Sequence, residues 1–539
     1  MRVHRAEPSL RRVAGLWPWL PVLFAGVYAV LFLINLRSIV DSVYLSADIV
    51  SAPYLGELAR QAPPGAHILL GNIAWFPVLW FELATHWLPA HRQIWELTPY
   101  VLSLVGVGLV AWSAHKAGGR SAAVLTAAVL VAAGPGLLTY QFAWSIHALT
   151  YVEVAILGAF LVLCVTHHGR IGGGATHVSL VGLVGAITAV GLASDKLLAL
   201  AGLAPFLLAA LATLSVEPRD AGRRIVTTAG AVAVVGVLGA VLLGQLVTGA
   251  HISTAHFPIT LAGYQQLAPH LLLALRSIAY LFDGDLGGLT LSFASTLKLV
   301  CAAVVAAAVL AGLVAAGGQI RPIVMGGGAR DDRISGAQAA HLAFWSLVIC
   351  VTGLGYVLSS VPVDVYTSRY LVPAAYGLAA VLTVLATSGG RYRVAVVGGV
   401  SVLILAGTVS LVRHDLQANQ SRFPTTSLSG PLLHFARSKG LKYGYSGYWD
   451  AAPLTWQTET GVDVYPVARC GATVCPFHLH QISSWYTPRA GIRTFLINDP
   501  TQSGDPGRPA SLGQPTQTVH IGRLAVYVYP YDIASKFGP

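Results

Sequence analysis

Apolar runs of about 20 residues recur along this chain from residue 13 to about residue 412. A helix of about 20 apolar residues is long enough to cross the hydrocarbon core of a bilayer. Only 10% of the residues are charged, whereas soluble globular chains have about 25%. The pattern therefore predicts a mainly α fold, a polytopic membrane helix bundle, and argues against a soluble enzyme or a disordered protein.

About eleven membrane-spanning helices fit these runs. The first, 13–36, follows four arginines and is longer than the apolar core of a signal peptide, so we interpret it as an uncleaved helix. The others are predicted at 96–115, 120–138, 146–166, 178–193, 195–214, 223–248, 291–316, 340–360, 370–388 and 393–412. The apolar segment 68–89 contains Glu82 and His86, and we predict that it lies in the outer interface as an amphipathic segment.

The lysines and arginines indicate the orientation of the bundle. With the N-terminus in the cytoplasm, the cytoplasmic segments hold 15 of these residues and the outer loops hold six, as the excess of positive charge on the cytoplasmic side requires. The net charge of +11 is thus explained by topology, and no nucleic-acid partner is expected. The module 1–413 then has two long outer loops, 37–95 and 249–290, and residues 414–539 form an extracytoplasmic domain.

The first outer loop carries the first candidate catalytic residues. Asp41 follows the first span closely, and Asp48 comes seven residues later. If residues 39–60 are helical, Asp41, Tyr44 and Asp48 share one face at the membrane surface, where carboxylates could deprotonate a hydroxyl or hold a sugar. Alternatively, the two carboxylates only solvate an interfacial helix. His67, in the same loop, is a further candidate for substrate binding.

A second group of candidates precedes the tenth span. Arg369 and Tyr370 lie at the predicted membrane–water boundary, and the planar guanidinium of arginine is suited to binding phosphate. The alternative is ordinary anchoring of a helix end. Within the predicted spans, Glu153 requires a polar interior, and Asp195 is expected to pair with the adjacent Lys196.

The segment 414–539 alternates short helix-like and strand-like stretches, which predicts a small α/β domain. Cys470 and Cys475 lie in it, five residues apart with Gly471 between them. An oxidising exterior permits a disulfide there. The alternative for this cysteine pair is a divalent metal site, in which zinc would also bind His478 and His480. We favour the disulfide and expect no cofactor.

The layout of the chain resembles the GT-C superfamily of membrane glycosyltransferases. The motifs that carry the resemblance are the stretch from Asp41 to Asp48, the junction from Ser368 to Pro373, and the stretch from Tyr443 to Asp450. Many relatives have an adjacent acidic pair in the first loop, whereas Ser42 and Val43 follow Asp41 here. The resemblance implies a cell-envelope enzyme with Asp41 as general base and Arg369 as a ligand of the donor phosphate, and the Ala-, Val- and Gly-rich composition indicates a bacterial protein.

The resemblance also implies the substrates. The donor would be a sugar, hexosyl or pentosyl, linked to a polyprenyl phosphate, and the acceptor would be an envelope glycan, a lipid or a protein. Such a donor already carries its leaving group, so no nucleotide-binding fold is needed, and the sequence has no Gly-rich phosphate loop. A transporter or lipid flippase is the main alternative, but the sequence shows no internal repeat of the kind that transporters commonly have.

Overall fold

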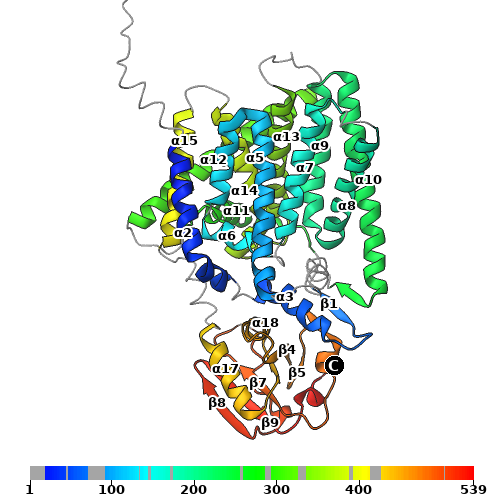
Figure 1. Ribbon diagram of the computed structural model, residues 1–539, viewed down its shortest axis with the longest axis vertical. Helices are drawn as coiled ribbons and strands as arrows, with labels where there is room; N and C mark the ends of the chain where they lie inside the picture. Colours follow the sequence, from blue (N-terminus) through cyan, green and yellow to red (C-terminus); the bar gives the residue numbers. More distant parts are fainter. Residues whose placement is uncertain are drawn as a thin grey trace, which may run out of the picture.

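The computed structural model of the chain describes residues 19–43, 47–70, 91–132, 134–143, 147–169, 174–254, 259–285, 293–325, 335–387, 393–412, 426–502 and 504–538. Most of the amphipathic segment predicted at 68–89 lies outside these residues, as does Tyr44. The described chain has two parts, a helix bundle and a smaller domain of strands and helices at one end of it (Figure 1).

Eight helices of the described residues are long and apolar enough to cross a membrane, so the protein is a multi-pass membrane protein. They include α2 (Leu20–Val43), α5 (His91–Val131), α7 (Ala148–Thr166), α8 (Gly174–Ser194), α10 (Arg219–Gly249), α13 (Gly336–Leu358), α14 (Val372–Thr387) with the short helix η5 (Val365–Leu371) before it, and α15 (Arg393–Val412). Two shorter apolar helices lie at Ala199–Ser215, which contains α9 (Ala204–Ala212), and at Ser295–Leu310 within α12 (Phe293–Met325).

Helix α5 explains how eight long helices correspond to about eleven predicted spans. Gly119 has a non-helical backbone with a positive φ of 81°, a conformation that glycine adopts at little cost, and it divides α5 into two arms. The chain folds back there, because Ser103 in the first arm donates a hydrogen bond to the carbonyl of Gln141, at 3.0 Å, in α6 (Pro135–Gln141). When the two arms are counted separately and the two shorter apolar helices are included, the apolar helices of the described residues overlap all the predicted spans.

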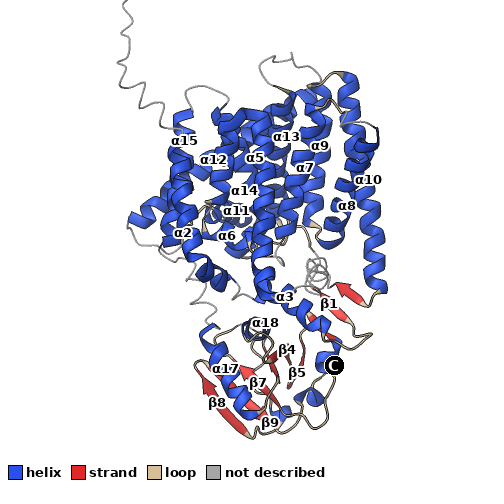
Figure 2. Cartoon of the chain, in the orientation of Figure 1, coloured by secondary structure: helices blue, strands red, loops and turns tan. Residues whose placement is uncertain are grey.

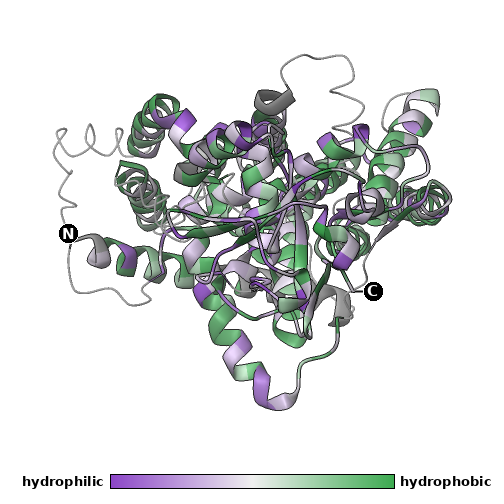
Figure 3. Cartoon of the chain, turned by 90° about the horizontal axis from the view of Figure 1, so that it is seen from below, coloured by the Kyte–Doolittle hydropathy of each residue, from purple (hydrophilic) through white to green (hydrophobic). Residues whose placement is uncertain are grey.

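The outward surfaces of the bundle are apolar. On α10, Leu238, Leu242 and Leu246 are each exposed by 60% or more, and helices at the periphery are largely hydrophobic in Figure 3. An exposed apolar surface of this extent is unfavourable in water and matches lipid. Polar contacts lie inside instead, as where His341 of α13 contacts the hydroxyl of Ser113 on α5, at 3.1 Å.

The C-terminal part is an α/β domain, and Figure 2 shows that the strands lie at this end of the molecule. Its six-stranded sheet has the order β5-β4-β3-β7-β9-β8, in which β3 pairs in parallel with β4 and β7. The strands are β3 (Tyr443–Ser446), β4 (Asp463–Cys470), β5 (Thr473–Pro476), β7 (Thr494–Asn498), β8 (Gln517–Ile521) and β9 (Leu524–Tyr529), with helices α17 (Thr426–Lys439) and α18 (Tyr448–Gln457). The predicted α/β domain is therefore present.

A second, three-stranded sheet joins this domain to both long loops of the bundle. Its central strand β1 (Ile68–Leu70) comes from the first loop and pairs with β2 (Ile252–Thr254) of the second loop and with β6 (Gln481–Ile482) of the C-terminal domain. Backbone hydrogen bonds thus hold three distant segments at the same end of the bundle (Figure 1).

Helix α3 (Ala47–Arg60) of the first loop lies against the C-terminal domain. Its Tyr54 is 1% exposed and donates a hydrogen bond to the carbonyl of Val464, at 2.9 Å. The ring of Tyr54 also contacts Trp485, with ring centroids 5.1 Å apart. Elsewhere at this interface, Trp456 donates a hydrogen bond to Glu96 of α5, at 3.2 Å. These buried contacts fix the position of α3.

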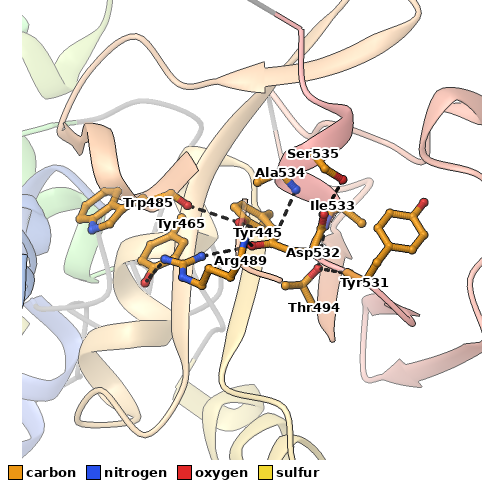
Figure 4. Close-up of polar contacts among 10 residues, drawn as sticks. All are labelled: Tyr445, Tyr465, Trp485, Arg489, Thr494, Tyr531, Asp532, Ile533, Ala534 and Ser535. Carbon is orange, nitrogen blue, oxygen red and sulfur yellow. Dashed lines mark hydrogen bonds and ion pairs between the residues drawn. The ribbon is translucent and has the colours of Figure 1, made fainter. Parts of the chain in front are cut away.

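Trp485 belongs to a polar and aromatic cluster inside the C-terminal domain, shown in Figure 4. Trp485 stacks on Tyr465, with ring centroids 5.0 Å apart. The hydroxyl of Tyr445 lies within hydrogen-bond distance of both the carbonyl of Trp485 and the carboxylate of Asp532. Arg489 forms an ion pair with the same carboxylate, at 3.5 Å. Because the buried Asp532 has these partners, the cluster forms a rigid base beneath α3.

Residues 39–60, considered above as one helix, are described in two parts. Helix α2 ends at Val43 and α3 begins at Ala47, with residues 44–46 outside the described chain. Asp41 is in the last turn of α2 and Asp48 in the first turn of α3. The described residues place Asp41 in α2 and Asp48 in α3, but they include neither Tyr44 nor the side chain of Asp41, so the shared face inferred from helical spacing stays a prediction.

Candidate active site

Asp48 lies where three segments of the chain meet. Its carboxylate accepts a hydrogen bond from the hydroxyl of Tyr448, at 2.9 Å, and forms an ion pair with Nη1 of Arg369, at 3.4 Å. Asp48 comes from the first loop, Arg369 from the turn before α14, and Tyr448 from the C-terminal domain. Between a quarter and a third of the Asp48 and Arg369 side chains remains exposed, so a ligand can reach both charges.

The position of Asp48 is set by α3. Ten residues of this fourteen-residue helix are buried, because it fills the space between the bundle and the C-terminal domain. Asp48 is in its first turn, where a negative charge is favoured by the helix dipole. The hydroxyl of Ser51 donates to the carbonyl of Asp48, at 3.1 Å, so the backbone that carries the carboxylate is also held.

Arg369 is held by the short helix η5. The Asp364 side chain caps this helix by accepting from the backbone of Tyr366, at 2.9 Å. On the bundle side, the hydroxyl of Tyr151 donates to the carbonyl of Arg369 itself, at 2.8 Å. The guanidinium lies over the ring of Tyr370, 5.4 Å from the centroid, a favourable cation–π contact. A rigid turn thus presents the guanidinium at the end of the bundle.

Tyr448 reaches Asp48 from the first turn of α18. Burial, followed by the neighbouring Asp48 carboxylate, raises the pKa of Tyr448 well above its usual value of 10.0, so the phenol stays protonated and acts as a donor. The ring stacks on Phe477, with centroids 4.8 Å apart, and on His480, at 6.0 Å. Burial lowers the pKa of His480 to about 4, which keeps this imidazole neutral at physiological pH.

The strand that precedes these aromatic residues is held by a disulfide. Cys470 and Cys475 are bonded, with Cα atoms 5.8 Å apart, across the turn between β4 and β5. Gly471 occupies this turn with a φ of 60°, a left-handed conformation that glycine favours. Phe477 follows β5 directly, so the disulfide lies next to the aromatic group around Tyr448.

Of the residues predicted from the sequence, Asp48, Arg369 and Tyr370 come together. Asp41 is close in sequence, in the last turn of α2, but its side chain is outside the described residues, and Tyr44 is wholly outside them. His67 is exposed and its backbone pairs with Ser483, at 2.9 Å, beside β1. In the described chain, no group of three or more His, Cys, Asp or Glu residues could hold a metal ion.

From the sequence, Phe477 received no role, His480 was considered only as a zinc ligand, and Tyr448 appeared only within the stretch from Tyr443 to Asp450. Tyr448 is the last residue of the stretch 442–448, which the sequence predicts as a strand, whereas in the structure it begins α18. The structure also changes the partner of Asp195, which contacts His147, at 2.6 Å, instead of the adjacent Lys196 predicted from the sequence.

Comparisons with known proteins give one distant structural likeness. No protein-family model matches the chain, and no curated protein matches it in sequence. Among solved structures, the chain is similar to ArnT from Cupriavidus metallidurans in the apo state, with a TM-score of 0.41 and 15% identity over 95% of this chain and 99% of that one. A likeness this distant assigns no function.

Proposed function

We propose that the protein is a membrane glycosyltransferase that moves a sugar from a polyprenyl-phosphate donor to an acceptor hydroxyl of an envelope glycan, lipid or protein. The observation that carries the proposal is the pair formed by Asp48 and Arg369 at the end of an apolar bundle. A carboxylate and a guanidinium are the two groups that transfer from a phosphate leaving group requires.

The location of the pair also favours a lipid-linked donor. Arg369 directly precedes the apolar helix α14, and Asp48 follows α2 after a short connection. A phosphate bound there would have its prenyl chain beside the apolar helices and its sugar facing the C-terminal domain. Consistent with the charge count, we place the N-terminus in the cytoplasm and the C-terminal domain outside.

In the reaction we propose, Arg369 binds the donor phosphate and releases Asp48 from their ion pair. The freed Asp48 carboxylate takes the proton of the acceptor hydroxyl. At the same time, the hydroxyl oxygen bonds to the anomeric carbon of the donor sugar. The bond from that carbon to the phosphate oxygen breaks through an oxocarbenium-like state, and the polyprenyl phosphate leaves with the bonding electrons. We assign the base to Asp48 because it contacts Arg369, whereas the resemblance assigns it to Asp41.

The Tyr448 hydroxyl supports this assignment, because it donates to the same carboxylate at 2.9 Å and would orient it. The aromatic rings of Tyr448, Phe477 and His480 lie side by side next to Asp48. We propose that this end of the C-terminal domain contacts the acceptor, since aromatic faces commonly pack on sugar rings.

The test uses the purified full-length protein and a donor labelled in both the sugar and the lipid. We expect lipid phosphate to be released in an acceptor-dependent manner, with one sugar transferred for each lipid phosphate formed. Movement of the intact donor across a vesicle membrane without its cleavage would contradict the proposal and would support a flippase instead.

A further inference from the structure

His147 and Asp195 form a buried ion pair next to the candidate active site. Nδ1 of His147 lies 2.6 Å from Oδ2 of Asp195, and the two residues are 2% and 5% exposed. His147 caps α7 and Asp195 lies in the turn after α8. The two helix ends therefore meet through this contact.

The other hydrogen bonds of Asp195 show that its carboxylate is ionised. It accepts from the hydroxyl of Thr150 and from the backbone N–H of Leu197, the latter at 2.9 Å. With Nδ1–H of His147, three donors surround one buried carboxylate, and donors of this kind favour its charged form. A buried negative charge is stabilised by a donor or cation close by, and Nδ1 of His147, at 2.6 Å, is in the position to supply it.

The second nitrogen of this imidazole has no hydrogen-bond partner in the part of the chain that the structure describes. Nε2 of His147 is buried and makes no hydrogen bond within the described residues. A buried N–H group left without an acceptor is costly, and more so when it carries charge. His147 also has a left-handed backbone, with a φ of 63°, a strained conformation of the kind that clusters at functional sites.

The ring of His147 faces the residues that hold Arg369. It lies 4.8 Å from the ring of Tyr370, and the Arg369 guanidinium lies 5.4 Å from that same ring. One turn along α7, Tyr151 donates to the carbonyl of Arg369. His147 and Arg369 are thus grouped around Tyr370, and each has its own carboxylate partner, Asp195 for His147 and Asp48 for Arg369.

We propose that Nε2 of His147, held as an imidazolium by Asp195, is a second charged donor to the phosphate of the lipid-linked substrate, alongside Arg369. The inference rests on the proposed function and deepens it by adding a binding residue from α7. Asp195 acts as a positioning residue, because it fixes the charge and the orientation of the ring without contacting the ligand. The ligand class is a prenyl phosphate, which is a phosphodiester in the sugar-linked donor and a monoester in the released product, and its phosphate oxygens can accept hydrogen bonds from both residues.

The experiment measures binding to the full-length protein in neutral-lipid nanodiscs. The probes are geranylgeranyl phosphate, geranylgeraniol as the same chain without phosphate, and inorganic phosphate as a competitor. We expect His147→Gln to weaken binding of the prenyl phosphate about 10- to 100-fold, the range for a hydrogen bond to a charged group, and to leave binding of the alcohol unchanged. Asp195→Asn should weaken phosphate binding in the same direction.

The matched control is His341→Gln, which changes another fully buried histidine inside the bundle and should leave the preference for phosphate intact. If the wild type prefers the phosphate and His147→Gln keeps that preference, the role of His147 is overturned while the proposed function stands. If His147→Gln loses the alcohol as well, the residue serves packing, and the inference is also overturned. A wild type without any preference, or one displaced equally by inorganic phosphate, would contradict the lipid-phosphate site itself.

Discussion

Replacing Arg369 by lysine tests how the donor is bound. Lysine keeps the positive charge but loses the planar fork that can donate two parallel hydrogen bonds to a phosphate. A hydrogen bond to a charged group contributes about 1.5–3 kcal/mol, and about 1.4 kcal/mol corresponds to a tenfold change in an equilibrium constant. Because 26% of the Arg369 side chain is exposed, we use the lower end of this range. Arg369→Lys should then raise the donor KM about tenfold.

Arg369→Ala removes both the charge and the cation–π contact with Tyr370, and should raise the donor KM by about 100-fold. The assay is release of lipid phosphate as a function of donor concentration at saturating acceptor. The matched control is Arg276→Lys, since Arg276 is another exposed arginine in an ion pair, with Asp285 at 2.8 Å, in the second loop. Unchanged donor KM in both Arg369 variants would refute the reasoning and leave Arg369 as a membrane anchor.

Three further predictions concern the C-terminal domain. Membrane-impermeant thiol reagents should label Cys470 and Cys475 in intact cells only after reduction, and efficient labelling without a reductant would contradict an exterior disulfide. Tyr448→Phe keeps the ring but removes the donor to Asp48, so kcat should fall roughly tenfold, and an unchanged kcat would separate this hydroxyl from the reaction. Burial, followed by the nearby Asp499, raises the pKa of Asp450 from 3.8 to about 7, so the folded protein binds this proton more tightly than the unfolded chain does. The free energy of unfolding should therefore fall as pH rises from about 4 to about 7, by at most about 4 kcal/mol from this group. The apparent Tm of Asp450→Asn should depend less steeply on pH than that of the wild type. An equal dependence of Tm on pH in both proteins would refute this prediction.

The helix bundle could be predicted from the sequence because its signal is local. An apolar run of sufficient length has few alternatives to a membrane helix, and even the turn at Gly119 falls between two predicted spans. Some strands of the C-terminal domain were also visible as short apolar stretches, such as Leu524–Tyr529, which is strand β9, whereas β5 and β8 were not predicted. Residues 44–46, between α2 and α3, lie outside the described residues, so the shared face of Asp41, Tyr44 and Asp48 stays a prediction.

The candidate site was only partly predictable, because its contacts are long-range. Asp48 and Arg369 are 321 residues apart, and Asp48 and Tyr448 are 400 apart. Residue chemistry and position near a span pointed to the first two, but nothing local indicates that Tyr448 reaches Asp48. The pairing of Asp195 was mistaken for a similar reason: Lys196 is its neighbour in sequence, but the buried His147 is its neighbour in space.

The most direct test of the account is the rate of sugar transfer by Asp48→Asn and Asp41→Asn, measured in the purified protein with a labelled polyprenyl-phosphate sugar. Asparagine preserves the size of each side chain and removes its ability to accept a proton. Loss of a general base typically lowers a rate by about 10²–10⁴-fold, whereas a surface substitution changes stability by about 0.5 kcal/mol or less. We expect Asp48→Asn to lower the rate of sugar transfer by about 10²–10⁴-fold. The variant should still insert into the membrane and bind a prenyl phosphate. Full activity of Asp48→Asn with an inactive Asp41→Asn would move the base to Asp41, and full activity of both variants would contradict catalysis by the first-loop carboxylates.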